Sequence, residues 1–271
     1  MGASRLNDGE RLYLGWLGMR NVLEVRDLKV WFPIKKGIFA RTSGYVKAVD
    51  GVSFDLHRGE TLGVVGESGS GKSTIVRVIT GLQKPTEGSC RLDGRVAMVF
   101  QDPLGSLNPR MTVRATLEES SGVSRSSSAS RTTGTVFTPL ELLSLVGLDA
   151  SALDKYPHEF SGGQRQRICI ARAIATKPEL LICDEAVSAL DLSIRAQVLD
   201  LLEDLKRKLG LSLLFITHDL GVVRHIADRI LVMNRGKIIE EGPCGQVLKA
   251  PREEYTRYLI SSVPKIGKPL T

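Results

Sequence analysis

A glycine-rich run at residues 66–74 contains the residues whose types and spacing most clearly suggest chemistry. It reads Gly66-Glu67-Ser68-Gly69-Ser70-Gly71-Lys72-Ser73-Thr74. The run follows the apolar segment 61–65 and opens a helical pattern, which is the context that a phosphate-binding loop requires. Glycines let backbone N–H groups converge on phosphate oxygens, and a helix N-terminus adds a partial positive charge. Lys72 can reach the β- and γ-phosphates of a nucleotide, and the Ser73 hydroxyl can ligate Mg²⁺.

Two adjacent carboxylates, Asp184 and Glu185, follow the apolar run 180–183. Phosphoryl transfer needs one carboxylate to hold Mg²⁺ through its water shell and a second group to position the attacking water. Asp184 suits the first role and Glu185 the second. Taken alone, two acids after a strand more often mark the start of a solvated loop. The phosphate loop upstream favours the catalytic interpretation.

A second glycine-containing segment, Ser161-Gly162-Gly163-Gln164, precedes a long helical pattern. Its simplest interpretation is a helix N-terminus that Ser161 caps. Two glycines at the positive end of a helix also expose N–H groups that can bind an anion. Two anion sites on one chain suggest that two chains share nucleotides.

The elements that must position these residues follow from the alternation of apolar runs and helical patterns. Residues 61–65, 180–183 and 212–216 are short apolar runs that predict strands buried on both faces. Residues 164–176, closed by Pro178, and residues 194–209, closed by Gly210, predict helices. Residues 22–25 predict the first strand. This pattern predicts an α/β domain around a largely parallel core.

Composition places the chain among ordinary globular proteins. It has 271 residues, 42% hydrophobic and 25% charged, and a formal net charge of +7. The positive surplus fits an anionic partner without identifying one. No run approaches the roughly 18 apolar residues that a membrane span needs. The cysteines show no metal-ligand spacing, and Cys169 and Cys183 are expected to be buried reduced thiols, which indicates a reducing compartment.

Six motifs in a fixed order make the chain similar to the ATP-binding subunits of ABC transporters. They are residues 66–74, Gln101, residues 160–164, Asp184-Glu185, residues 188–191 and His218. The resemblance covers residues 22 to 264. It implies an α/β P-loop NTPase fold with a mixed, largely parallel core sheet, an N-terminal antiparallel β subdomain and an inserted α-helical subdomain.

The amino-acid sequences of three further segments resemble those of one branch of that family, whose members import oligopeptides, dipeptides or nickel. These segments are residues 48–54, residues 99–113, and residues 240–243 leading to Tyr255-Thr256-Arg257. Some relatives carry a C-terminal cysteine cluster for an iron–sulfur centre, and the lone Cys244 argues against such a centre here.

The family resemblance implies a role for each motif residue. ATP would lie between two subunits, bound by Gly66, Ser68, Gly69, Ser70, Gly71, Lys72, Ser73 and Thr74 of one and by Ser161, Gly162, Gly163 and Gln164 of the other. Glu185 would polarise the attacking water, and His218 would contact the γ-phosphate. Ser73, Gln101 and Asp184 would hold Mg²⁺, and Gln101 would also reach the attacking water as a catalytic residue. Asp191 would lie at the dimer seam. Without the family, the favoured interpretation of His218 would be a strand-end histidine satisfied by Asp219.

Two segments depart from the family pattern. Phe32 ends a strand-like run where the family places its adenine-stacking aromatic, but residues 33–44 look inserted, so Tyr45 is a rival. The Ser/Thr-rich residues 120–138 are expected to form a surface loop within a helical subdomain at about 102–175, where the family has more helical sequence. The expected organisation is an N-terminal extension (1–20), one ABC domain (21–264) and a C-terminal tail (265–271).

The resemblance implies a peripheral ATPase on the cytoplasmic face of the cell membrane that uses ATP and Mg²⁺ to drive import of peptides or a similar small solute. Its implied partners are transmembrane permease subunits, a second ABC ATPase subunit (identical or homologous) and an extracytoplasmic solute-binding protein, with no direct nucleic-acid contact. One alternative is a soluble ABC-type ATPase of nucleic acid or translation, although the second cassette or coiled-coil insertion common in such proteins is not seen. Another is an accessory ATPase of a cytosolic complex, for example in phosphonate breakdown.

Overall fold

The computed structural model describes residues 20–36, 41–122 and 137–262. The chain divides into two compact units. Unit 1 takes its described residues from the segments up to Asp93 and from Ser212 onward, and unit 2 spans residues 94–211.

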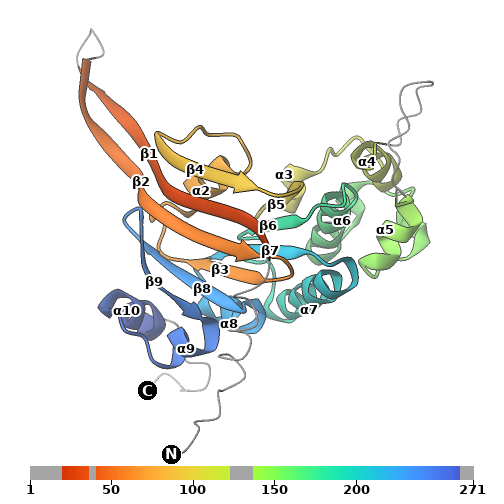
Figure 1. Ribbon diagram of the computed structural model, residues 1–271. Coiled ribbons are helices and arrows are strands. Elements are labelled where there is room, and N and C mark those ends of the chain that lie inside the picture. The colour runs from red at the N-terminus through yellow and green to blue at the C-terminus, as the bar shows by residue number, and fades with distance from the viewer. Residues whose placement is uncertain (1–19, 37–40, 123–136, 263–271) are drawn as a thin grey trace, which may run out of the picture. The chain divides into compact units, whose positions relative to one another are not determined.

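Unit 1 contains an antiparallel sheet in the order β2-β1-β4, formed by β1 (Asn21–Lys36), β2 (Arg41–His57) and β4 (Glu87–Leu92). The predicted strand at 22–25 is confirmed, but the expectation that Phe32 ends a separate run is wrong. Cross-strand pairing continues past Phe32, with Pro33 opposite Tyr45, so one strand runs on to Lys36. Of the residues that look inserted in the sequence, 33–36 and 41–44 therefore belong to the outer part of a long hairpin, visible at the upper left of Figure 1, and 37–40 lie outside the described residues.

Unit 1 also contains the strands that carry the phosphate loop. β3 (Thr61–Val65) pairs in parallel with β7 (Ser212–Thr217) and β8 (Arg229–Asn234), and β9 (Lys237–Pro243) pairs antiparallel to β8. Every residue of β3 and β7 is buried, which confirms the interpretation of their apolar runs. The helices of this unit are α2 (Lys72–Ile79), α8 (Leu220–Ile226), α9 (Cys244–Lys249) and α10 (Glu254–Ser262).

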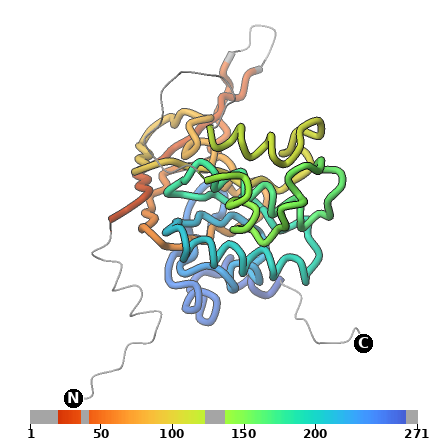
Figure 2. Tube along the Cα trace, turned by 90° about the vertical axis from the view of Figure 1, so that its right-hand side faces the viewer, coloured from red at the N-terminus to blue at the C-terminus, as the bar shows by residue number. Residues whose placement is uncertain are grey.

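Unit 2 combines a parallel strand pair, β5 (Val96–Val99) and β6 (Leu180–Asp184), with a group of helices. The helices are α3 (Pro103–Ser106), α4 (Val113–Ser120), α5 (Pro139–Leu145), α6 (Gly162–Ile174) and α7 (Leu192–Leu209), with 3₁₀ turns η1 (Ala150–Ala152) and η2 (Pro157–Glu159). Figures 1 and 2 show α4, α5 and α6 side by side.

Both long helices predicted in unit 2 are confirmed, and their ends have local causes. α6 begins two residues earlier than expected because Ser161 caps it. α7 ends at Gly210, which adopts the left-handed conformation with φ 66° that favours glycine. Of the Ser/Thr-rich run, Ser120 ends α4 and Thr138 caps α5, whereas residues 123–136 lie outside the described residues.

The cysteines behave as the sequence predicts. Cys169 and Cys183 are free and buried, and burial raises the pKa of Cys169 to about 11 and that of Cys183 to about 12. Such thiols are packing groups rather than nucleophiles at neutral pH. Within the described ranges, no helix has the length and apolar character needed to cross a bilayer.

Candidate functional site

The predicted phosphate loop connects the end of β3 to the start of α2 in unit 1, and its glycines are required by geometry. Gly66 and Gly71 have φ of 155° and 108°, which side chains rarely adopt. A Cβ on Gly66 would lie 2.2 Å from the carbonyl oxygen of Met233, and a Cβ on Gly71 would lie 2.4 Å from that of Ala48. The backbone of β8 and β2 therefore lies so close to the loop that only glycine fits at positions 66 and 71.

The ammonium group of Lys72 lies inside this loop. Its Nζ donates to the carbonyl oxygens of Gly66 at 2.6 Å and Glu67 at 2.8 Å, and to Ser70 Oγ at 3.3 Å. Only 7% of Lys72 is exposed. These oxygens stabilise the charged form of a nearly buried amine, and they hold a positive charge among the loop N–H groups.

The N-terminus of α2 is open to an anion. Gly71 occupies the cap position, so no side chain caps the helix, and its first turn contains no acidic residue. The first N–H groups of a helix lack partners within the helix and carry its positive dipole end. Ser73, in that first turn, is exposed. This arrangement of loop, lysine and helix end is chemically suited to bind phosphate groups.

His218 follows the strand next to the loop. β3 and β7 are parallel, and Val65 is paired with Thr217, so Gly66 and His218 both come directly after neighbouring strand ends. His218 is exposed, and the next residue, Asp219, caps α8 by accepting from the N–H of Gly221 at 2.8 Å. The structure thus brings His218 to the same sheet edge as the phosphate loop.

In unit 2 an equivalent pairing brings Gln101 close to the two predicted carboxylates. β5 and β6 are parallel with Val99 opposite Cys183, so Asp184 ends β6 at the sheet edge where Gln101 comes two residues after β5. Gln101 is exposed, whereas Asp184 and Glu185 are half-buried. Parallel strand ends meet at one sheet edge, where α/β proteins usually bind their ligands.

The backbone at Glu185 is strained. Its φ of 49° lies in the left-handed region, which costs a non-glycine residue about 1–3 kcal/mol. The turn that follows stabilises this conformation, because the carbonyl of Glu185 accepts from the N–H of Ser188 at 3.0 Å and from its Oγ at 2.9 Å. Strain of this kind concentrates at functional sites, and it occurs here at the residue predicted to position the water.

The second glycine segment forms the capped start of α6. Ser161 Oγ accepts from the N–H of Gln164 at 3.3 Å, and Gln164 Oε1 accepts from the N–H of Ser161 at 3.0 Å. This reciprocal pair confirms the predicted cap. A Cβ on Gly163 would lie 2.4 Å from Ile194 Cγ2, whereas one on Gly162 would meet nothing nearer than 3.8 Å. Gly163 therefore also allows α6 and α7 to pack closely.

Asp191 occupies the cap position of α7 and is exposed. The turn before it is held from α7, since a guanidinium nitrogen of Arg195 donates to the carbonyl oxygens of Ser188 at 3.5 Å and Leu190 at 3.4 Å. Arg195 thus helps to fix the segment that presents Asp191.

The two rival aromatic residues lie on opposite faces of the β1–β2 hairpin. Phe32 alternates with the buried Leu28 and Val30, and 38% of Phe32 is exposed. Tyr45 lies opposite Pro33, and its ring centroid is 6.3 Å from that of Trp31. Tyr45 therefore packs on Trp31, and Phe32 is the aromatic on the face that carries the core residues.

Several contacts of the site were not predicted from the sequence. Ala48 and Met233 wall the phosphate loop, Ile194 packs on Gly163, and the hydroxyl of Tyr255 accepts from the N–H of Glu67 at 3.2 Å. Each contact joins residues far apart in the chain, so no local spacing indicates it. Tyr255 appears in the sequence only as part of a segment typical of the family branch.

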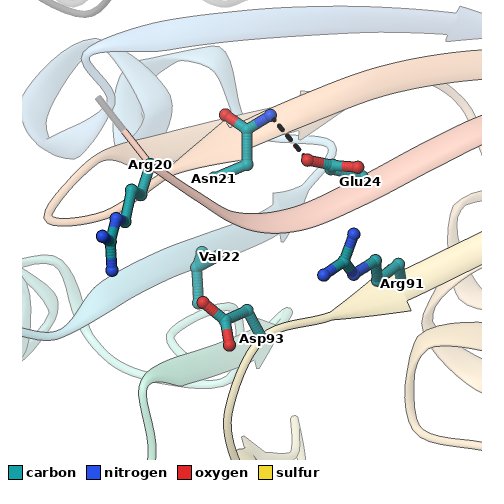
Figure 3. Close-up of a pocket in the computed structure, with 6 residues that line it drawn as sticks. All are labelled: Arg20, Asn21, Val22, Glu24, Arg91 and Asp93. Carbon is teal, nitrogen blue, oxygen red and sulfur yellow. Dashed lines mark hydrogen bonds between the residues drawn. The ribbon is translucent and has the colours of Figure 1, made fainter. Parts of the chain in front are cut away.

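A separate hollow of about 320 Å³ lies at the start of β1 (Figure 3). Its lining residues are Arg20, Asn21, Val22, Glu24, Arg91 and Asp93. Its lining carries both charges, Glu24 Oε1 accepts from Asn21 Nδ2 at 3.2 Å, and none of the predicted site residues contributes to it.

Comparisons with known proteins place the chain among ATP-binding cassettes. It is 50% identical over 264 residues to the oligopeptide transport ATP-binding protein AppF of Bacillus subtilis, covering 91% of this chain and 79% of AppF. It is 46% identical over 262 residues to the dipeptide transport ATP-binding protein DppF of Escherichia coli, covering 91% and 77%.

A solved structure of the cassette MJ0796, a post-hydrolysis dimer bound to ADP and phosphate, matches with a TM-score of 0.65 and 26% identity, covering 82% of this chain and 98% of that one. The ABC transporter domain family matches residues 49–188, from β2 to the turn after Glu185. The chain therefore belongs to the ABC transporter family.

Proposed function

We propose that this chain is the ATP-binding and ATP-hydrolysing subunit of an importer for oligopeptides or dipeptides. The observation that carries the proposal is the phosphate loop, in which Lys72 lies inside a glycine loop that opens an uncapped helix. Relatives such as AppF and DppF, named as peptide transport ATP-binding proteins, support the transport role. These relatives do not support the alternatives of an ATPase that acts on nucleic acid or in translation, or of an accessory ATPase in phosphonate breakdown.

The residues of unit 1 bind the nucleotide in this proposal. Lys72 exchanges its loop carbonyls for the β- and γ-phosphates, the N–H groups of the loop and of the first turn of α2 bind phosphate oxygens, and His218 contacts the γ-phosphate. Phe32 stacks on the adenine, because it is the aromatic on the core-carrying face of the hairpin while Tyr45 packs on Trp31.

The residues of unit 2 complete the reaction. Glu185 accepts a hydrogen bond from the attacking water and orients it toward the γ-phosphorus. The Asp184 carboxylate and the Gln101 amide oxygen fit Mg²⁺, since this ion prefers oxygen ligands, and in unit 1 the Ser73 hydroxyl also fits it. When bound, Mg²⁺ neutralises charge on the phosphates.

The proposal requires a second ATPase subunit. Ser161, Gly162, Gly163 and Gln164 lie at the start of a helix. Ser161 and Gln164 use their N–H groups in the cap, so the N–H groups of Gly162 and Gly163 can meet the phosphates of ATP held by another copy or a homologue. Asp191 lies at the seam between the two. ATP-driven closure of this dimer switches permease subunits on the cytoplasmic face of the membrane, and a solute-binding protein delivers the solute from the other side.

The test is hydrolysis by the Glu185→Gln variant. The amide keeps the size of the side chain but cannot act as the carboxylate base, so we expect ATP binding to persist and turnover to fall at least a hundredfold. Gel filtration with Mg-ATP should show the variant accumulating as a closed dimer with itself or with its homologous mate. Turnover at the parent rate would remove Glu185 from the proposed role.

A further inference from the structure

The phosphate loop is held from outside by the C-terminal helix. Tyr255 lies in α10, and its hydroxyl oxygen accepts from the backbone N–H of Glu67 at 3.2 Å, although 188 residues separate the two. The carbonyl oxygen of the same Glu67 accepts from Lys72 Nζ at 2.8 Å. The backbone of Glu67 is therefore fixed on one side by Tyr255 and on the other by the lysine assigned to the nucleotide.

The ring of Tyr255 packs at a defined position on the core of unit 1. It packs against a buried cluster that includes Val65, Ile230 and Val232 of strands β3 and β8. Val65 is the last residue before the loop. Burial raises the pKa of the Tyr255 hydroxyl, so at neutral pH the group stays protonated and acts as a neutral acceptor.

The start of α10 is also anchored. The Glu240 carboxylate accepts from the backbone N–H groups of Arg252 at 2.8 Å and Glu253 at 3.2 Å. Although burial opposes it, this hydrogen bonding holds the pKa of Glu240 below its ordinary value, so an ionised group fixes the chain just before Tyr255. A helix held in this way can keep its tyrosine hydroxyl at a fixed position.

We propose that Tyr255 is a positioning residue of the nucleotide site. By holding the N–H of Glu67, it fixes the planar peptide unit between Gly66 and Glu67, whose carbonyl oxygen accepts from Lys72 Nζ at 2.6 Å. This contact keeps the loop backbone in the shape that receives phosphates. The inference rests on the phosphate-loop assignment under the proposed function. Because the contact is to the loop backbone and not to the water-positioning Glu185, it governs ATP affinity rather than the chemical step.

The first experiment compares Tyr255→Phe with the parent in the full chain. The variant keeps the packing of the aromatic ring and removes only the hydroxyl oxygen that accepts from Glu67. The dissociation constant and KM for Mg-ATP should therefore rise about three- to tenfold, the range for one neutral hydrogen bond. The kcat should stay within about twofold. Tyr258→Phe is the matched control, since Tyr258 is exposed on the same helix and should leave both constants unchanged.

A double-mutant cycle tests the bond itself. Glu67→Pro removes the donor N–H, so in that background Tyr255→Phe should change ATP affinity by less than about twofold. A full additive effect there would overturn the inference. So would an unchanged KM in Tyr255→Phe accompanied only by a lower Tm, because that result describes a purely structural tyrosine.

The Lys72→Ala variant distinguishes a failure of the Tyr255 positioning role from a failure of the proposed function. If Lys72→Ala binds ATP as tightly as the parent, the loop assignment fails and the role of Tyr255 falls with it. If Lys72→Ala weakens binding and Tyr255→Phe does not, the positioning role alone is overturned.

Discussion

Arg229 Nε lies 3.2 Å from Glu60 Oε1, and the two side chains are only 6% and 0% exposed. Glu60 also accepts from the N–H of His57 at 2.8 Å, while Arg229 faces His57 Nε2 at 3.4 Å and Glu241 Oε1 at 3.6 Å. This buried cluster joins the end of β2 to the starts of β3 and β8. A buried ion pair persists only where further hydrogen bonds offset the cost of desolvation.

The Glu60 cluster predicts a pH-dependent stability. Burial raises the pKa of Glu60 to about 7, although Arg229 and the His57 N–H oppose the shift. The folded state therefore binds this proton more tightly than the unfolded chain, in which the pKa is near 4.5. The free energy of unfolding should accordingly fall as the pH rises from about 4.5 to 7, by about 1–3 kcal/mol from this group.

Urea unfolding at pH 5 and pH 8 measures this effect against Glu60→Gln, which cannot ionise. The parent should lose about 1–3 kcal/mol more than the variant between the two pH values. His57 and Glu241 titrate in both proteins, so the difference reports Glu60. Equal losses in parent and variant would show that the Glu60 pKa is not raised.

Gly71→Ala should damage the phosphate loop much more than Gly69→Ala. Both glycines have positive φ, but a Cβ on Gly71 would lie 2.4 Å from the Ala48 carbonyl oxygen, whereas one on Gly69 meets no atom within 4 Å. Gly69→Ala bears only the conformational cost of about 1–2 kcal/mol. Gly71→Ala adds a backbone clash and should lose ATP binding, as calorimetry would measure. Similar losses of ATP affinity in the two variants would contradict the predicted clash with the Ala48 carbonyl oxygen.

Gly163→Ala should destabilise the packing of α6 on α7. The added Cβ would lie 2.4 Å from Ile194 Cγ2, and overpacking of this kind costs about 1–3 kcal/mol in chemical denaturation. Gly162→Ala is the control and should cost under about 1 kcal/mol, because its nearest neighbour is 3.8 Å away. In an Ile194→Ala background the cost of Gly163→Ala should shrink, and strict additivity would argue against direct contact.

Phe32→Ala should weaken ATP binding about tenfold, since stacking on an aromatic ring contributes about 1–3 kcal/mol per base. Tyr45→Ala should change it less than twofold, because Tyr45 packs on Trp31 on the other face of the hairpin. Equilibrium titration with ATP compares the variants, and circular dichroism checks that the hairpin remains folded. The reverse order of effects would assign the adenine to Tyr45.

The elements that depend on local sequence were predictable. The run 66–74, the strand before it and the helix after it are contiguous, so residue types and spacing alone indicate the loop. The cap of α6 by Ser161 and the end of α7 at Gly210 involve neighbours within a few residues, and both were predicted. The length of β1 was not, because pairing with β2 carries it past Phe32 to Lys36.

The amino-acid sequence by itself determined the family, the chemistry and the order of the motifs, because each motif is a short run whose function depends on its own spacing. Only the tertiary structure decided which backbone walls the loop, which face of the hairpin carries Phe32, and that Tyr255 holds Glu67. Those relationships depend on the register between strands and on packing between distant segments. The periodicity of residues within one segment does not predict which distant segment will pack against it.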